Sequence, residues 1–151
     1  MPPIILLAAV CALTAAALMT DSLRRGRVHC ALRKLAVEQR MHFSAYDQLR
    51  LAPRVANGLD VPGAAAVGIV DLLYASEDGR YRYIFTVEYT TGVVQSKRRI
   101  RRAAAFSEPR ERTATVPPCA IRMAPIELPL LEQYRWLLQA PVPPAPTSGS
   151  E

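Results

Sequence analysis

The feature that most constrains this chain is an apolar run near its N-terminus. Ile4 to Met19 reads IILLAAVCALTAAALM, sixteen residues without a charged side chain. As an α-helix the run rises ~24 Å, and its neighbours Pro3 and Thr20 bring it closer to the roughly 30 Å of a bilayer's hydrocarbon core. Seven of the sixteen residues are Ile, Leu or Val, which favour insertion. We therefore predict that residues 1–22 form an N-terminal transmembrane anchor.

Arginines follow the apolar run at once, which predicts its orientation. Arg24, Arg25 and Arg27 lie within eight residues of Met19, and the positive-inside rule keeps such residues in the cytoplasm. We predict a single-pass protein of the cell membrane with a cytoplasmic soluble domain, whose three arginines contact anionic lipid headgroups. The alternative is a domain secreted after signal cleavage behind Ala17. A signal peptide, however, carries its basic residues before the apolar run, and here only the amino terminus is charged there.

The clearest secondary-structure signal is an alternation within Arg80 to Thr90 (RYRYIFTVEYT). Apolar side chains occupy every second position: Tyr81, Tyr83, Phe85, Val87 and Tyr89. A period of two is typical of a β-strand with one buried face. Val67–Tyr74 and Val93–Phe106 flank this segment across short turns with Gly, and Cys119–Met123 is a shorter strand candidate. The sequence therefore predicts an antiparallel meander of three to four strands.

Helices are predicted on both sides of the meander. Residues 21–40 continue the anchor, and a second helix begins at Ser44, whose hydroxyl can cap it, and stops at Asn57-Gly58. A third helix from Leu130 to Gln139 has one apolar stripe, which leaves Trp136 partly exposed. The helices before and after the meander can cover its aromatic face. We predict an α+β domain over residues 23–140 and a disordered Pro/Ser-rich tail over 141–151.

A basic hexapeptide, KRRIRR, stands out within a net charge of +6. It supplies five candidate anion-binding residues: Lys97, Arg98, Arg99, Arg101 and Arg102. In a strand these cations divide between two faces. A purely structural interpretation is that they protect a sheet edge from pairing and that Glu88 forms an ion pair with one of them on the neighbouring strand. The nearby aromatic side chains read as core and not as exposed stacking platforms. We therefore do not expect nucleic acid as a partner.

The residue types that carry catalysis or bind metal are not grouped in this sequence. His29 and His42 would fall on nearly opposite faces of one helix, and Cys30 beside His29 forms no metal-ligand spacing. His42, Ser44 and Asp47 lie too close together for a catalytic triad. Glycines stand singly at turns, so no phosphate loop is indicated. We predict a protein that is not an enzyme, with no cofactor, metal or small-molecule substrate.

Several short motifs occur in a characteristic order. They are Arg40–Ser44 (RMHFS), Asp47–Leu51 (DQLRL), Tyr83–Gly92 (YIFTVEYTTG), Phe106–Arg110 (FSEPR) and Leu128–Tyr134 (LPLLEQY). With these motifs the chain resembles small single-helix membrane proteins of unknown function from planctomycete-type bacteria, over about Leu23 to Leu138. The resemblance implies an architecture of membrane helix, meander and terminal helix, and it implies no site residues.

Two functions fit these patterns, and they predict different surfaces. The first is a non-enzymatic module that binds another protein at the cytoplasmic face, through an exposed apolar patch around Trp136 or through a sheet edge. The second is an anion-binding module for anionic lipid or nucleic acid that uses residues 97–102. It predicts that the basic strand shares one exposed face with the arginines that follow the anchor.

Overall fold

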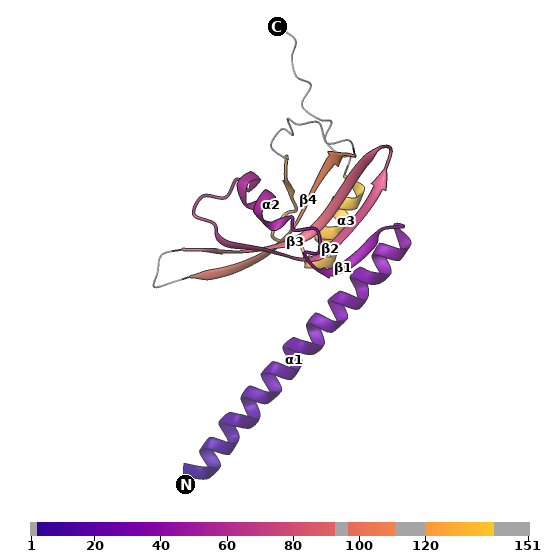
Figure 1. The fold of residues 1–151 in the computed structure, drawn as a ribbon. Helices are drawn as coiled ribbons and strands as arrows, with labels where there is room; N and C mark the ends of the chain where they lie inside the picture. Colours follow the sequence, from indigo (N-terminus) through magenta and orange to yellow (C-terminus); the bar gives the residue numbers. More distant parts are fainter. Residues whose placement is uncertain (1–2, 93–96, 111–119, 141–151) are drawn as a thin grey trace.

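The computed structural model describes residues 3–92, 97–110 and 120–140, and its longest element is the N-terminal helix α1 (Pro3–Glu38) (Figure 1). The apolar turns of α1 project from the rest of the chain, and Ile4 is 76% exposed. By length and composition this helix can cross a membrane, and because it lies near the N-terminus it also suits a signal sequence. The last turns of α1 pack on the domain through Leu32, Leu35 and Ala36. The predicted continuity of the apolar segment with a helix that packs on the domain is confirmed.

The domain is built on one antiparallel sheet with the strand order β1-β2-β3-β4-β5. Its strands are β1 (His42–Tyr46), β2 (Ala65–Glu77), β3 (Arg80–Thr91), β4 (Arg98–Pro109) and β5 (Arg122–Met123). β2, β3 and β4 form the predicted meander, with Phe85 of β3 opposite Ala104 of β4. The expected α+β class is confirmed, and the sheet of the described residues has one strand more than the predicted maximum.

The additional strand is β1, where the sequence predicted the start of a helix. Ser44 pairs with Leu72 of β2, and its hydroxyl donates to the carbonyl of Tyr46 at 2.7 Å instead of capping a helix. The helix α2 (Ala52–Gly58) begins later. The two carboxylate oxygens of Asp47 accept the N–H groups of residues 51 and 52, each at 2.8 Å. The capping residues Ser44 and Asp47 favour a helix start, but residues 42–46 instead pair with the edge of β2 as a strand.

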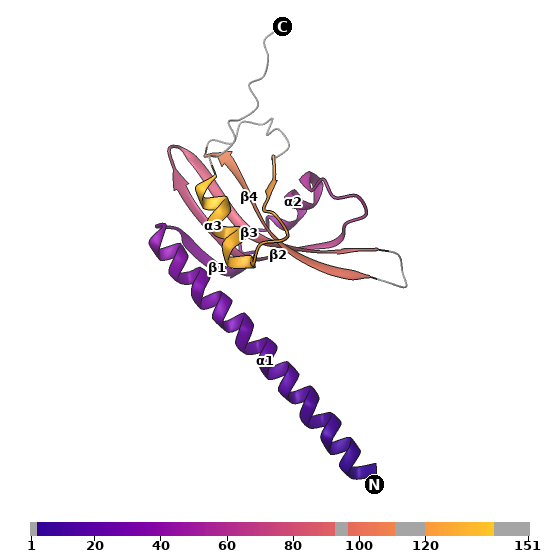
Figure 2. The same ribbon diagram turned by 180° about the vertical axis from the view of Figure 1, so that it is seen from behind.

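Each face of the sheet has its own cover. The aromatic face of β3 packs against Leu51 and Val55 at α2. The opposite face packs against the end of α1 and against α3 (Leu130–Gln139), which lie together on it in Figure 2. The expectation that the helix after the meander helps to cover the aromatic face is therefore wrong. Ile84 and Leu73, on the alternate positions of their strands, are also fully buried and require this second layer.

The element boundaries agree with the sequence pattern in most places. α3 begins and ends at the predicted residues, and β3 extends one residue beyond the prediction. β5 is shorter than predicted, with Met123 opposite Ala104 and Arg122 opposite Ala105. The expected strand start at 93–96, the strand residue Cys119 and the tail at 141–151 lie outside the described residues.

Candidate functional site

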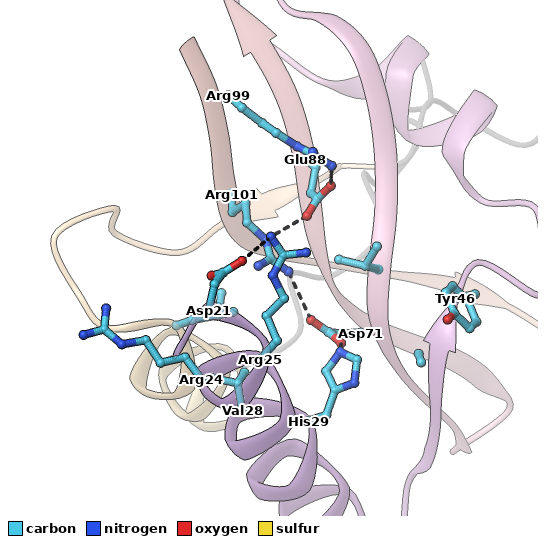
Figure 3. Close-up of a pocket in the computed structure, with 13 residues that line it drawn as sticks. Asp21, Arg24, Arg25, Val28, His29, Tyr46, Asp71, Glu88, Arg99 and Arg101 are labelled. Carbon is cyan, nitrogen blue, oxygen red and sulfur yellow. Dashed lines mark hydrogen bonds and ion pairs between the residues drawn. The ribbon is translucent and has the colours of Figure 1, made fainter. Parts of the chain in front are cut away.

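An open cleft of about 400 Å³ lies where α1 reaches the sheet (Figure 3). We call it the juxtamembrane cleft. Its lining residues are Asp21, Arg24, Arg25, Val28 and His29 of α1, Ala45 and Tyr46 of β1, Val70 and Asp71 of β2, Glu88 of β3, Arg99 and Arg101 of β4, and Leu130 of α3. The cleft therefore joins the residues that directly follow the apolar run of α1 to the basic strand, which lies about 75 residues further along the chain.

The basic strand divides between two faces, as its alternation predicts. Arg99 and Arg101 point into the cleft, and both pair with Glu88 of the neighbouring strand, Arg101 through its Nε atom at 2.8 Å. Glu88 stands opposite Arg101 in the register, so the predicted cross-strand ion pair is confirmed. Arg102 faces the other way and donates from its Nε atom to the carbonyl of Ala124. Arg98 is exposed and does not line the cleft.

Two arginines of α1 form the other wall of the cleft. Arg25 pairs with Asp21 one turn earlier at 2.8 Å, and Figure 3 shows its side chain extending toward Arg101. Arg24 points away from the sheet, and no carboxylate of the described residues pairs with it. Arg27, the third arginine expected at lipid headgroups, does not line the cleft. The three arginines were predicted to share one role, but in the structure they have different surroundings.

The inner end of the cleft holds a buried acid, Asp71. Asp71 is 1% exposed, and its φ of +55° lies in the left-handed region. It lies where the β2–β3 register is irregular, between Val70 and Leu73. A non-glycine residue in this conformation costs free energy, and such strained positions cluster at functional sites. The bulge turns the Asp71 carboxylate from the apolar strand toward α1.

His29 of α1 meets this carboxylate directly. Its Nε2 atom lies 2.6 Å from Oδ1 of Asp71, and Arg101 approaches Oδ2 at 3.6 Å. Burial raises the pKa of Asp71 above its usual range, and the charges of His29 and Arg101 oppose that rise. The His29 side chain is 45% exposed. A half-exposed imidazole therefore connects the cleft to a buried carboxyl that holds its proton more tightly than usual.

The strained backbone at Asp71 is supported from α3. The Tyr134 hydroxyl donates to the carbonyl of Asp71 at 2.6 Å and lies 2.8 Å from the Thr86 hydroxyl, which can donate to it. Tyr134 is fully buried, and this burial raises the pKa of its phenol well above the ordinary value. This network fixes the conformation of the bulge from behind, so the direction of the Asp71 carboxylate is determined by packing.

The sequence missed the pairing of His29 with Asp71. A signal was present, because Asp71 interrupts the apolar run VGIVDLLY, and an acid inside a buried strand needs a partner. His29 was considered only as a metal ligand together with Cys30 and His42. In the structure His42 stacks on Tyr74 at 5.2 Å between ring centroids instead.

The predicted surface around Trp136 and a second arginine–carboxylate cluster lie elsewhere on the domain. Trp136 is partly exposed, as expected, but the guanidinium of Arg122 lies 4.5 Å from its ring centroid and covers it. On the aromatic face, Arg54 of α2 pairs with Glu108, which also accepts the Tyr83 hydroxyl at 2.9 Å. We call these three residues the α2 clip. Glu108 is 5% exposed, so the carboxylate of this second arginine–carboxylate cluster is shielded from solvent.

Comparisons of this chain with protein families, curated proteins and solved structures give no match. The resemblance to single-helix membrane proteins stays a prediction, and the site must be interpreted from its own chemistry.

Proposed function

We propose that this protein is a membrane-anchored, non-enzymatic module that binds an anionic group in the juxtamembrane cleft. One observation carries the proposal: Arg24 and Arg25, which follow the anchor, line the same cleft as Arg99 and Arg101 of the basic strand. An anion-binding module was expected to bring these two sets of arginines to one exposed face, whereas a protein-interaction module was not. In the alternative surface around Trp136, the guanidinium of Arg122 lies over the ring.

The charge of the cleft favours an anion. Four arginines and three carboxylates line it, which leaves an excess of one positive charge when His29 is neutral. Guanidinium groups bind phosphate and carboxylate oxygens in pairs of parallel hydrogen bonds. The Arg25–Asp21 pair is exposed, with 65% and 59% of the two side chains accessible, and such pairs contribute at most about 1 kcal/mol. An incoming anion can therefore take over these donors at little cost.

A binding role fits this cleft better than a catalytic role. Its described lining residues include no serine, threonine or cysteine that could act as a nucleophile. His29 is held by a buried carboxylate, and the other side chains that line the cleft are arginines, acids, Tyr46 and apolar residues. We propose further that the domain faces the cytoplasm, because the arginines flank the anchor on this side. A reporter fused after Glu151 tests that orientation.

The binding test uses the full chain in neutral detergent micelles with inorganic phosphate as the probe. Phosphate binding, followed by ³¹P line broadening, should weaken about tenfold in Arg99→Gln, because a charge-assisted hydrogen bond contributes roughly 1.5–3 kcal/mol. Arg98→Gln removes the same charge from the next residue, which lies outside the cleft, and should change the affinity less than about twofold. Equal effects of the two substitutions would show diffuse attraction and contradict the proposal.

A second candidate function, binding of another protein, rests on a different observation. An apolar groove of about 400 Å³ lies between α2 and the beginning of β2, lined mainly by small side chains such as Ala52, Ala56 and Ala64. The adjacent strand edge is irregular, since Ala66 has a φ of +51° and the register shifts there, and such bulges discourage edge pairing. A photo-crosslinker at residue 56 should give a discrete protein adduct in native membranes, and one at the exposed Val37 should not.

A further inference from the structure

We infer that the anion held in the juxtamembrane cleft is the phosphodiester of an anionic phospholipid from the leaflet around α1. The inference rests on the proposed function and names the ligand class of the same site. It differs from general attraction of arginines to a membrane because it assigns the headgroup to two walls, one from α1 and one from β4.

The depth of the cleft along α1 is the first argument. A hydrocarbon core of roughly 30 Å takes up about twenty helical residues, which from Pro3 reach Ser22. Arg24 and Arg25 then lie about 3–5 Å beyond the hydrocarbon, within a headgroup layer of roughly 5–8 Å per leaflet. The α1 residues that line the cleft extend from Asp21 to His29, so the cleft opens in the layer where lipid phosphates reside.

The orientation of the side chains is the second argument. Figure 3 shows Arg24 directed away from the sheet and Arg25 directed toward Arg101 across the cleft. Arg99 is 69% exposed and shares Glu88 with Arg101. A phosphate at the mouth of the cleft can therefore receive guanidinium donors from both walls without displacing the buried Asp71.

The direction of the basic strand is the third argument. In Figures 1 and 2 the end of the β3–β4 ribbon where β4 begins extends to the side of the molecule toward which α1 leaves the domain. The first residues of β4 and the anchor therefore approach the same membrane surface. Cations that only protected a sheet edge would not need this direction.

The charge excess is the fourth argument and selects the type of phosphate. With His29 neutral, four arginines against three carboxylates leave one positive charge, which matches the single negative charge of a lipid phosphodiester. A dianionic phosphomonoester would require a second uncompensated cation. Anionic lipids with one phosphodiester, such as phosphatidylglycerol, are therefore the expected ligands.

The experiment reconstitutes the full chain in phosphatidylcholine vesicles with acyl-chain spin-labelled phosphatidylglycerol or diacylglycerol. Electron paramagnetic resonance measures the relative association constant of each lipid at the protein. Wild type should prefer phosphatidylglycerol, and Arg25→Gln and Arg99→Gln should each reduce that preference about fivefold. The matched controls Arg27→Gln and Arg98→Gln should reduce it less than twofold. Fluorescence of Trp136, the only tryptophan, verifies that each variant is folded.

Each other outcome overturns a specific statement. Equal losses in Arg25→Gln and Arg27→Gln would show that the membrane surface attracts all arginines alike, which overturns a defined site. An effect of Arg25→Gln without one of Arg99→Gln would overturn the second wall. If inorganic phosphate binds in micelles but phosphatidylglycerol is not preferred, the cleft takes soluble anions and only the lipid assignment fails. If neither binds, the proposed function fails with it.

Discussion

Two arginine–carboxylate clusters occupy opposite faces of the same sheet, and they differ in how far water reaches them. In the α2 clip, the Glu108 side chain is 7% exposed and Arg54 is 33% exposed. In the juxtamembrane cleft, Arg99 is 69% and Arg101 38% exposed. Arg54 and Arg101 are therefore similarly exposed, and the main difference is that the cleft has a second arginine, Arg99, that is largely open to water.

The difference separates a structural role from a binding role. Glu108 receives both the guanidinium of Arg54 and the hydroxyl of Tyr83, so its oxygens are engaged inside the protein. Removing one member of such a buried set leaves another polar group without its partner, and this is costly. The cleft has an open mouth, and under the proposed function its arginines exchange a carboxylate for an external anion. Substitutions in the clip should change stability, and those in the cleft should change binding.

The largest expected effect belongs to the clip. Glu108→Ala should lower the free energy of unfolding by about 3–5 kcal/mol, because it removes the buried carboxylate that pairs with Arg54 and accepts the Tyr83 hydrogen bond. Urea unfolding of the full chain in neutral micelles, followed by Trp136 fluorescence, measures this change. Glu77→Gln, at an exposed site of β2, should stay within about 0.5 kcal/mol of wild type. A loss below 1 kcal/mol for Glu108→Ala would contradict a structural role for the clip.

A smaller loss is expected behind the cleft. Tyr134→Phe removes the donor to the carbonyl of Asp71 and should cost about 1–3 kcal/mol, because that acceptor is buried. Tyr81→Phe serves as the control, since Tyr81 is only partly buried and no hydrogen bond of its hydroxyl occurs within the described residues. If both variants unfold at the same urea concentration, the bulge does not depend on α3.

The sequence predicted the meander and α3 well because their patterns are local. Alternation along β3 and the stripe on α3 each follow from neighbouring residues, and the structure agrees with both. β1 was not predicted because Ser44 and Asp47 resemble a helix start. The conformation of this segment instead depends on its pairing with the edge of β2, which lies far away in the sequence.

The candidate site was predictable only in part for the same reason. The alternation correctly placed Arg99 and Arg101 on one face with Glu88. The approach of α1 to β4, and the contact of His29 with Asp71, depend on how the helix packs on the sheet. No spacing in the sequence encodes that packing, although the isolated acid in an apolar strand indicated that a partner was needed.

A pH-dependent difference is expected from Asp71. Its pKa is raised by burial and by the charge of Glu88, against His29 and Arg101, so the folded state binds this proton more tightly than the unfolded state. The free energy of unfolding should therefore fall as pH rises above the ordinary value of 3.8 through the raised pKa. Each tenfold difference in proton affinity corresponds to about 1.4 kcal/mol.

Asp71→Asn tests this expectation against its own pH series. The variant should lose the part of the pH dependence that belongs to this carboxyl, so the stability difference between variant and wild type changes with pH in that window. Asp60→Asn, at an exposed site, should run parallel to wild type. A constant difference for Asp71→Asn at all pH values would show that the buried carboxyl titrates as it does in the unfolded chain.

The smallest change in stability should accompany an increase in binding. Asp21→Asn removes the exposed partner of Arg25 and should cost less than about 0.5 kcal/mol. It also raises the positive excess of the cleft from one charge to two, so phosphate affinity should increase about two- to fivefold. Glu132→Gln breaks a comparable exposed pair with Arg135 on α3, away from the cleft, and should leave phosphate affinity unchanged. Because the two substitutions alter net charge equally, only an anion held inside the cleft can distinguish them, whereas an anion attracted by the overall charge would respond to both.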